Sequence, residues 1–201
     1  MREVFLCLEE IALVTVLALA SSAVIVEVGF CCPDVAITPI TPTTSDNVDV
    51  TVSYLFGSAP PNVQEFGPFV QLGNTFSVNV AVYFPAPEDI VLFIVHTDYH
   101  TYSLGSLPVG EYEFKVYINR THFMEDFFLA EIVHFNVTFL GDIDHDFDVD
   151  IFDAVKCGIA YGSTPSDPAW NSHCDIAEQY GIINVFDIVT VATNYGERYT
   201  S

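Results

Sequence analysis

The stretch GDIDHDFDVDIFDAV, residues 141–155, decides how the C-terminal part of the chain is interpreted. Aspartate recurs there at nearly every second position, and like charges so close together repel one another unless a cation lies among them. A twelve-residue calcium loop takes ligands from positions 1, 3, 5, 7, 9 and 12, and position 7 contributes its backbone carbonyl. Counted from the first aspartate, the chain fills all of these positions, and the stretch therefore predicts a calcium site made by Asp142, Asp144, Asp146, Asp148 (through its carbonyl), Asp150 and Asp153.

Two features of the same stretch predict a weakened site. Position 6 of such a loop is normally glycine because the chain turns sharply there, and this chain has Phe147. A positive φ costs a bulky residue on the order of 1 kcal/mol or more. Position 12 is Asp153, which is shorter than the usual bidentate glutamate. We therefore expect calcium to bind with reduced affinity; the alternative is a solvated acidic loop without an ion.

A second copy of the unit follows the first. Shifting the chain by 34 residues places VDIFDAVKCGIAYG (Val149–Gly162) over INVFDIVTVATNYG (Ile183–Gly196) with the same apolar rhythm. Such a repeat indicates one supersecondary unit used twice, each copy burying the apolar face of the other. The second loop is degenerate: its position 1 is an isoleucine, and an aspartate lies one residue too early, which indicates an insertion. Its candidate ligands are Asp175, Glu178, Asn184 and Asp187.

Two loop–helix units joined by the short segment GSTPSDPAWNSHCD resemble a dockerin module. The resemblance covers residues 141–196, and the preceding IVHFNVTFLG is typical of a strand, whereas an isolated EF-hand would have a helix before its loop. The resemblance implies a module ordered by Ca²⁺ that docks onto a cohesin β-sandwich through helix residues near the loop ends. Those positions are Ile151, Phe152, Val185 and Phe186. The alternative is that they pack the two helices together, with the two phenylalanines as core residues.

The composition restricts the partners. The chain has 201 residues, a formal net charge of −22, a pI near 4.1 and 51% hydrophobic residues. It has 5 lysines plus arginines, too few to neutralise the phosphates of a nucleic acid. Anionic membrane surfaces are disfavoured for the same reason. Acidity together with a calcium loop suits an extracellular or cell-surface location.

The N-terminus, residues 1–30, is compatible with export. Ile11–Val26 is an unbroken run of apolar and small residues, shorter than the ~20 that a membrane span needs. Small-residue patterns typical of signal-peptide cleavage lie within this run, although Glu3, Glu9 and Glu10 are unusual in a basic leader. The segment is therefore expected to be a signal peptide, a retained helix that anchors the protein or assembles it into a filament, or a soluble core helix. Membrane contact is expected only through this segment, if it is retained.

Cysteines and sequons also fit an exported protein. Removal of a signal peptide would leave four cysteines, of which Cys157 and Cys174 lie in the two repeats. A disulfide between them would staple the two copies together. Asn119 and Asn136 begin acceptor sequons for glycosylation.

Residues 33–140 predict a β-domain. Segments with alternating, β-rich composition are separated by Gly, Pro and Asn clusters, a pattern typical of an antiparallel sandwich. The segment LGSLPVGEYEFKVYIN resembles the penultimate hairpin of immunoglobulin-like modules. We therefore predict an α+β, multidomain chain: an immunoglobulin-like sandwich over residues 33–140, then a small all-α dockerin-like domain over residues 141–201. The expected strands are Val48–Leu55, Thr75–Phe84, Ile90–Thr97, Glu111–Asn119 and Phe127–Leu140, after an extended lead-in or edge strand.

The β-domain carries no clear catalytic pattern. His96 and His100 would share a strand face, but no acidic or cysteine cluster accompanies them at ligand spacing. Paired carboxylates such as Glu111 and Glu113 suit a solvent-facing strand better than a glycosidase. We therefore expect a protein that is not an enzyme and that attaches, through calcium, to a cohesin-like or neighbouring β-domain. The alternatives are a self-assembling filament or surface-layer subunit and a carbohydrate-binding component of a polysaccharide-degrading complex.

Overall fold

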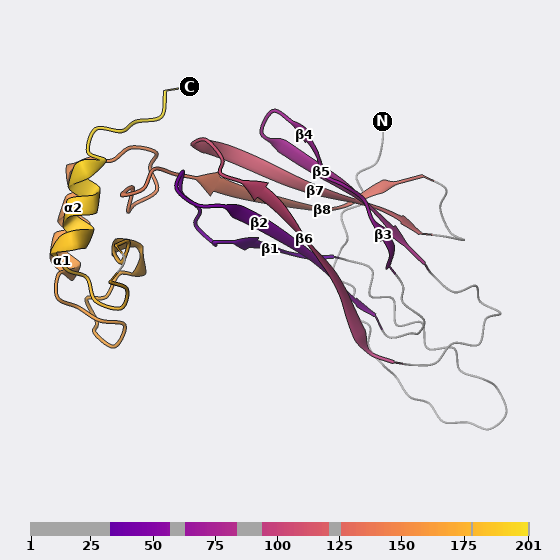
Figure 1. The fold of residues 1–201 in the computed structure, drawn as a ribbon, viewed down its shortest axis with the longest axis horizontal. Helices are drawn as coiled ribbons and strands as arrows, with labels where there is room; N and C mark the ends of the chain where they lie inside the picture. The colour runs from indigo at the N-terminus through magenta and orange to yellow at the C-terminus, as the bar shows by residue number, and fades with distance from the viewer. Residues whose placement is uncertain (1–32, 57–62, 84–93, 121–125, 178, 201) are drawn as a thin grey trace. The chain divides into compact units, whose positions relative to one another are not determined.

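The computed structural model describes residues 33–56, 63–83, 94–120, 126–177 and 179–200. This part of the chain is mostly β-sheet with two short helices (Figure 1). It divides into two compact units. The first contains Val50–Tyr102 and Glu113–Val133, and the second contains Ile37–Asp49, Ser103–Tyr112 and His134–Ser201. The predicted leader, residues 1–30, lies outside the described residues, and no described helix is long and apolar enough to span a membrane.

The strands form two sheets. The smaller sheet has the order β1-β2-β6, with strands β1 (Asp34–Thr38), β2 (Val48–Phe56) and β6 (His96–Gly105). The larger has the order β3-β5-β7-β8, and β4 pairs with β5; its strands are β3 (Val63–Phe66), β4 (Val70–Leu72), β5 (Thr75–Val82), β7 (Gly110–Arg120) and β8 (Phe128–Val137). The lead-in that we expected to be an edge strand is β1, at one edge of the smaller sheet.

Alternation along the strands builds the core of the β-region. Successive side chains of a strand point to opposite faces, so every second residue can be buried. In β2 the fully buried residues are Val48, Val50 and Val52, and β5 and β7 follow the same pattern. Tyr102 on β6 is also buried; its hydroxyl donates to the Gly67 carbonyl at 3.1 Å, and burial raises its pKa to about 12. This tyrosine therefore belongs to the core.

The strand pair β5–β7 differs from the expected antiparallel arrangement. These strands run parallel, from Thr75 opposite Glu113 to Val82 opposite Arg120. Parallel neighbours need a crossover connection, and here β6 joins the smaller sheet before the chain returns as β7. The strand expected at Ile90–Thr97 is also placed differently, because β6 begins at His96; residues 90–93 lie outside the described part.

The two helices belong to the second unit. Helix α1 is Ile151–Ala160, helix α2 is Val185–Thr193, and a short 3-10 turn η1 (Ser172–Cys174) lies between them. Each helix begins with a capping box, in which Asp150 or Asn184 accepts a backbone N–H two residues later at 2.7 Å. Between the repeats lies a small core of Ile143, Val149, Cys157, Ala160, Cys174, Ile183 and Val191.

Candidate metal centre

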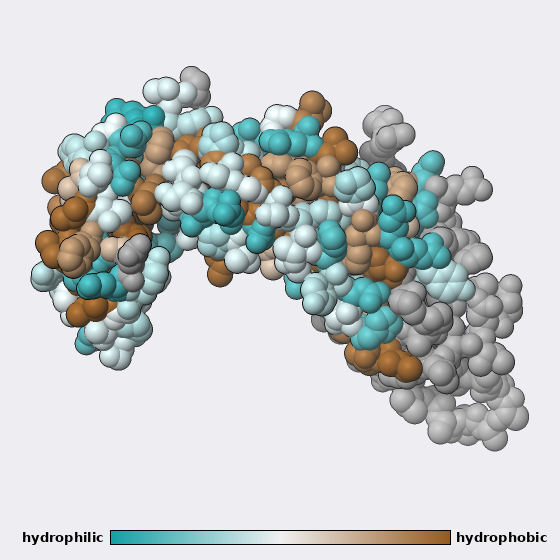
Figure 2. All heavy atoms as spheres, in the orientation of Figure 1, coloured by the Kyte–Doolittle hydropathy of each residue, from teal (hydrophilic) through white to brown (hydrophobic). Residues whose placement is uncertain are grey.

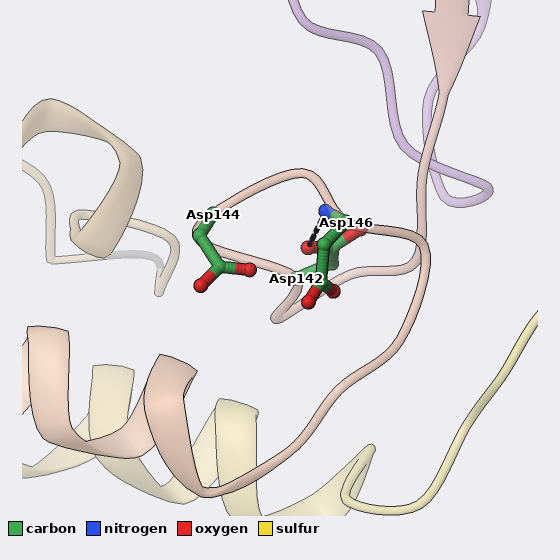
Figure 3. A group of neighbouring side chains, drawn as sticks. All are labelled: Asp142, Asp144 and Asp146. Atoms are coloured by element: carbon green, nitrogen blue, oxygen red, sulfur yellow. Dashed lines mark hydrogen bonds between the residues drawn. The ribbon is translucent and has the colours of Figure 1, made fainter.

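The first loop folds around the carboxylate of Asp142. This side chain is 4% exposed, and its two oxygens accept the backbone N–H groups of Asp146 at 3.2 Å and Phe147 at 3.1 Å. Figure 3 shows the first of these bonds, with the carboxylate of Asp144 turned toward the same space. These two hydrogen bonds fold the loop around Asp142, its first ligand position, and keep the following aspartates close to it.

The sharp turn expected at Phe147 is confirmed. Its φ is 70°, in the left-handed region that glycine enters without a Cβ clash, and His145 has a φ of 60°. The C-terminal segment holds Phe147 in place. The Tyr199 N–H donates to the Phe147 carbonyl at 3.0 Å, and the two rings contact each other at a centroid distance of 6.0 Å. The contacts of Phe147 with Tyr199 offset the strain of its positive φ.

Asp153 connects the loop to the helix. It is fully buried and accepts three backbone N–H groups: Ile143 at 2.7 Å and Asp144 at 3.2 Å on one oxygen, and Asp150 at 2.7 Å on the other. Each carboxylate oxygen has two lone pairs, so the second oxygen keeps one for a further partner. The residue at position 12 therefore shapes the loop in addition to any role as a ligand.

The six predicted ligands form two triads. One carboxylate oxygen from each of Asp142, Asp144 and Asp146 lies within 4.8 Å of the other two, and the same holds for Asp148, Asp150 and Asp153. The sequence predicted that Asp148 would ligate through its carbonyl and not through its carboxylate. Calcium–oxygen distances are about 2.3–2.6 Å, so two ligands of one ion lie at most about 5.2 Å apart. Each triad is thus compact enough to surround one ion. The sequence predicted a single set and did not predict this division.

Electrostatics in the first loop favour a cation. Burial raises the pKa of Asp142 to about 6, the charge of Asp153 adds to this, and the N–H donors of the loop oppose it. Two of the chain's five basic side chains lie here as well. Lys156 contacts Asp144 at 2.8 Å and Arg198 contacts Asp148 at 3.0 Å. Both are partly exposed and offset part of the negative charge.

The second loop repeats most of the hydrogen bonds of the first but not its carboxylates. Asp175 accepts the Gly181 N–H at 2.8 Å, as Asp142 accepts that of Phe147, so the insertion lies between Asp175 and Gly181. Asp187 accepts three backbone N–H groups, from Ile176, Ala177 and Asn184, at 2.7–2.9 Å. No acidic triad forms among the described residues of this loop, and its remaining candidate, Glu178, lies outside them.

Each loop is held by the helix end of the other copy. In the first, the Val149 N–H donates to the Glu197 carbonyl at 2.9 Å and the Gly196 N–H to the Val149 carbonyl at 2.8 Å. In the second, Ile183 exchanges the same pair of bonds with Ser163 at 3.1 Å and Gly162 at 2.8 Å. The partners are again 34 residues apart, so the two copies form one reciprocal unit.

The four predicted partner-binding residues lie on the exposed faces of the helices. Ile151 and Phe152 are 54% and 61% exposed, and Val185 and Phe186 are 51% and 54% exposed. The expectation that the two phenylalanines are core residues is therefore wrong, because Asp153 and Asp187 take the buried first-turn positions. Hydrophobic side chains gather over α1 and α2 in Figure 2, and further exposed members of this apolar helix face are Val155, Ile159 and Val189.

The cysteines of the two repeats meet, but the expected disulfide is not formed in the structure. Cys157 and Cys174 are free, fully buried thiols. The hydrogen bond with Cys174 and then burial raise the pKa of Cys157. Cys31 and Cys32 lie outside the described residues. Of the two predicted sequon asparagines, Asn136 is exposed on β8 and Asn119 is half-buried on β7.

Sequence reasoning missed several partners of the first loop. His145 contacts His173, which follows it by 28 residues, and Lys156, Arg198 and Tyr199 approach the loop from later segments. The repeat was the available signal, because it brings both helix ends back to the loops. No protein-family model matches the chain, and neither a curated protein nor a solved structure matches it. The assignment of the site therefore depends on its geometry.

Proposed function

We propose that the protein is a non-catalytic extracellular or cell-surface component whose C-terminal module binds Ca²⁺ and attaches to another protein. The observation that carries this proposal is the triad of Asp142, Asp144 and Asp146, each of which offers one carboxylate oxygen within 4.8 Å of the other two in a closed loop. All three ligands are carboxylates, the oxygen donors that calcium prefers. In this proposal residues 33–140 are an immunoglobulin-like domain, and residues 141–201 are a separate dockerin-like domain.

Calcium is coupled to the attachment surface through the start of α1. Asp150 caps this helix, and Asp153 in its first turn accepts N–H groups from the loop. An ion that orders the loop therefore orders the helix end that carries Ile151 and Phe152. The apolar helix face fits an apolar β-sheet surface, and we propose a cohesin-like β-domain as the partner.

Binding to a purified cohesin domain tests the proposal. The full chain, immobilised at fixed calcium, should bind the domain, and EDTA should release it. The double variant Phe152→Ser, Phe186→Ser should lose binding, because it removes the two large apolar side chains of the surface. A matched double variant, Leu72→Ser with Val70→Ser, changes exposed apolar residues of β4 and should bind like the parent.

Binding that survives both EDTA and the phenylalanine variant would contradict the proposed attachment. Size-exclusion chromatography in calcium separates the rival function. A shift to higher mass that depends on Phe152 and Phe186 would show self-assembly through the same face and would favour a filament or surface-layer subunit.

A further inference from the structure

Two histidines meet beside the first loop. The Nε2 atom of His145 lies 3.1 Å from the Nδ1 atom of His173, and the rings are nearly perpendicular at a centroid distance of 4.7 Å. His145 lies between two proposed calcium ligands, whereas His173 lies on η1 in the segment that connects the two copies. The contact therefore joins the first loop to a segment that is distant in sequence.

Both rings are carried by anchored backbone. Asn171 caps η1 by accepting the His173 N–H at 3.1 Å, and the next residue, Cys174, is fully buried against Cys157. On the other side, the hydrogen bonds of Asp142 fix the backbone immediately after His145. The backbone that carries each ring is thus held in place by its own segment.

The separation of the nitrogens matches the requirement of a metal ion. Zinc binds imidazole nitrogen at about 2.0–2.1 Å in tetrahedral sites, so two nitrogens of one ion lie about 3.3 Å apart. The observed 3.1 Å is close to this value.

We propose that His145 and His173 form a two-histidine site for a borderline transition-metal ion such as Zn²⁺. The remaining coordination positions would be filled by water. Imidazole suits zinc, copper and nickel, whereas the neighbouring carboxylates suit calcium, so the two kinds of donor select different metals. The ion would tie the connecting segment to the first loop and stabilise the module independently of calcium.

Zinc titration of the calcium-saturated full chain tests the site by calorimetry. Excess calcium keeps the carboxylates occupied, and the parent should bind one equivalent of zinc. The variant His173→Ala changes an exposed residue outside both loops and should weaken zinc binding at least about tenfold, since loss of an outer partner alone costs that much. The matched control His134→Ala removes another exposed histidine, on β8, and should bind zinc like the parent.

A second variant guards against an indirect effect. His145→Asn retains the preference for a left-handed backbone at this position and should also lose zinc. The calcium titration of His173→Ala should match the parent, because His173 lies outside both loops, which separates failure of this site from failure of the calcium loop. An unchanged zinc affinity in His173→Ala would place the zinc elsewhere and overturn the proposal. If the parent binds no zinc up to about 1 mM, far above the dissociation constants of specific sites, the proposal is wrong and the two histidines form only a hydrogen bond.

Discussion

The two loops share a hydrogen-bonded scaffold but differ in their carboxylates. In both, the last aspartate, Asp153 or Asp187, accepts three backbone N–H groups and lies fully buried. The first loop adds acidic side chains that form two triads, and the described part of the second loop forms none. The shape of such a loop therefore does not require the full set of acidic ligands.

The same comparison separates two roles for aspartate. Asp142 and Asp175 both receive an N–H group from the turn of their loop, so this contact is structural. Asp144 and Asp146 have no acidic counterparts among the described residues of the second loop. We therefore assign folding to the shared aspartates and calcium affinity to the additional ones.

The largest expected effect concerns the shared scaffold. Asp153→Ala and Asp187→Ala each leave three backbone N–H groups without their acceptor, and one unsatisfied buried group costs about 1–3 kcal/mol. Each variant should lose roughly 3 kcal/mol or more of the free energy of unfolding of the module, measured by urea denaturation. The matched variants to Asn retain one acceptor oxygen and should lose less. If one of the two alanine variants loses less than about 1 kcal/mol of the free energy of unfolding and the other loses more, the two loops are not equivalent in their hydrogen bonding.

The next effect is a pH dependence of the metal-free protein. The pKa of Asp142 is about 6 in the folded protein, against an ordinary value of 3.8 for this side chain, so the folded state binds this proton more tightly than the unfolded chain does. Stability from this group is therefore greatest below pH 4 and falls as the pH rises toward 6, by roughly 3 kcal/mol in total.

Unfolding in EDTA between pH 4 and 7 measures this dependence. The difference in the free energy of unfolding between the parent and Asp142→Asn should change with pH as predicted, because the amide of the variant does not titrate. Saturating calcium should remove the slope by favouring the ionised carboxylate. A parent and variant with identical profiles would show that burial does not raise this pKa.

Calcium itself should have a slightly smaller effect. An ion that binds the folded loop and not the unfolded chain stabilises by about 2.7 kcal/mol at a concentration one hundred times the dissociation constant. The double variant Asp144→Asn, Asp146→Asn should abolish the calcium-dependent melting shift, whereas Asp175→Asn should retain most of it. Scanning calorimetry with and without EDTA provides the measurement. A calcium-dependent melting shift that is lost in Asp175→Asn and kept in the double variant would assign the ion to the second loop.

The smallest effect comes from exchanging the turn residues of the loops. Phe147 has a φ of 70° and Gly181 a φ of 94° at the equivalent turn. Gly181→Phe should destabilise the protein by about 1–2 kcal/mol through the strain of a positive φ. No clash should add to this cost, because the space around an added Cβ is open. Phe147→Gly removes a backbone strain of similar size but also removes the contact with Tyr199. The free energy of unfolding should therefore change by less than about 1 kcal/mol, while calcium binds more tightly. Weaker calcium binding in Phe147→Gly would show that this contact outweighs the strain.

Local features of the site could be predicted from the sequence. Ligand spacing and the positive φ at Phe147 depend on neighbouring residues. The caps at Asp150 and Asn184 are equally local, although we did not predict them. Alternation likewise predicted β2, β5 and β7 to within a few residues. The features that were missed depend on distant partners.

The parallel pairing of β5 and β7 arises because β6 joins the other sheet, which no local pattern records. Strand β6 itself carries many polar residues and has few buried ones, so its alternation is weak. Phe152 and Phe186 are large and apolar, which favours the core as their predicted place. In the structure aspartates fill those inner positions to bind backbone N–H groups, which composition does not predict.

Diffraction from crystals grown in calcium would show whether calcium binds in the first loop. The anomalous signal should place one ion about 2.3–2.6 Å from carboxylate oxygens of Asp142, Asp144 and Asp146. An ordered first loop whose aspartates point into solvent, with no ion among them at saturating calcium, would contradict the claim.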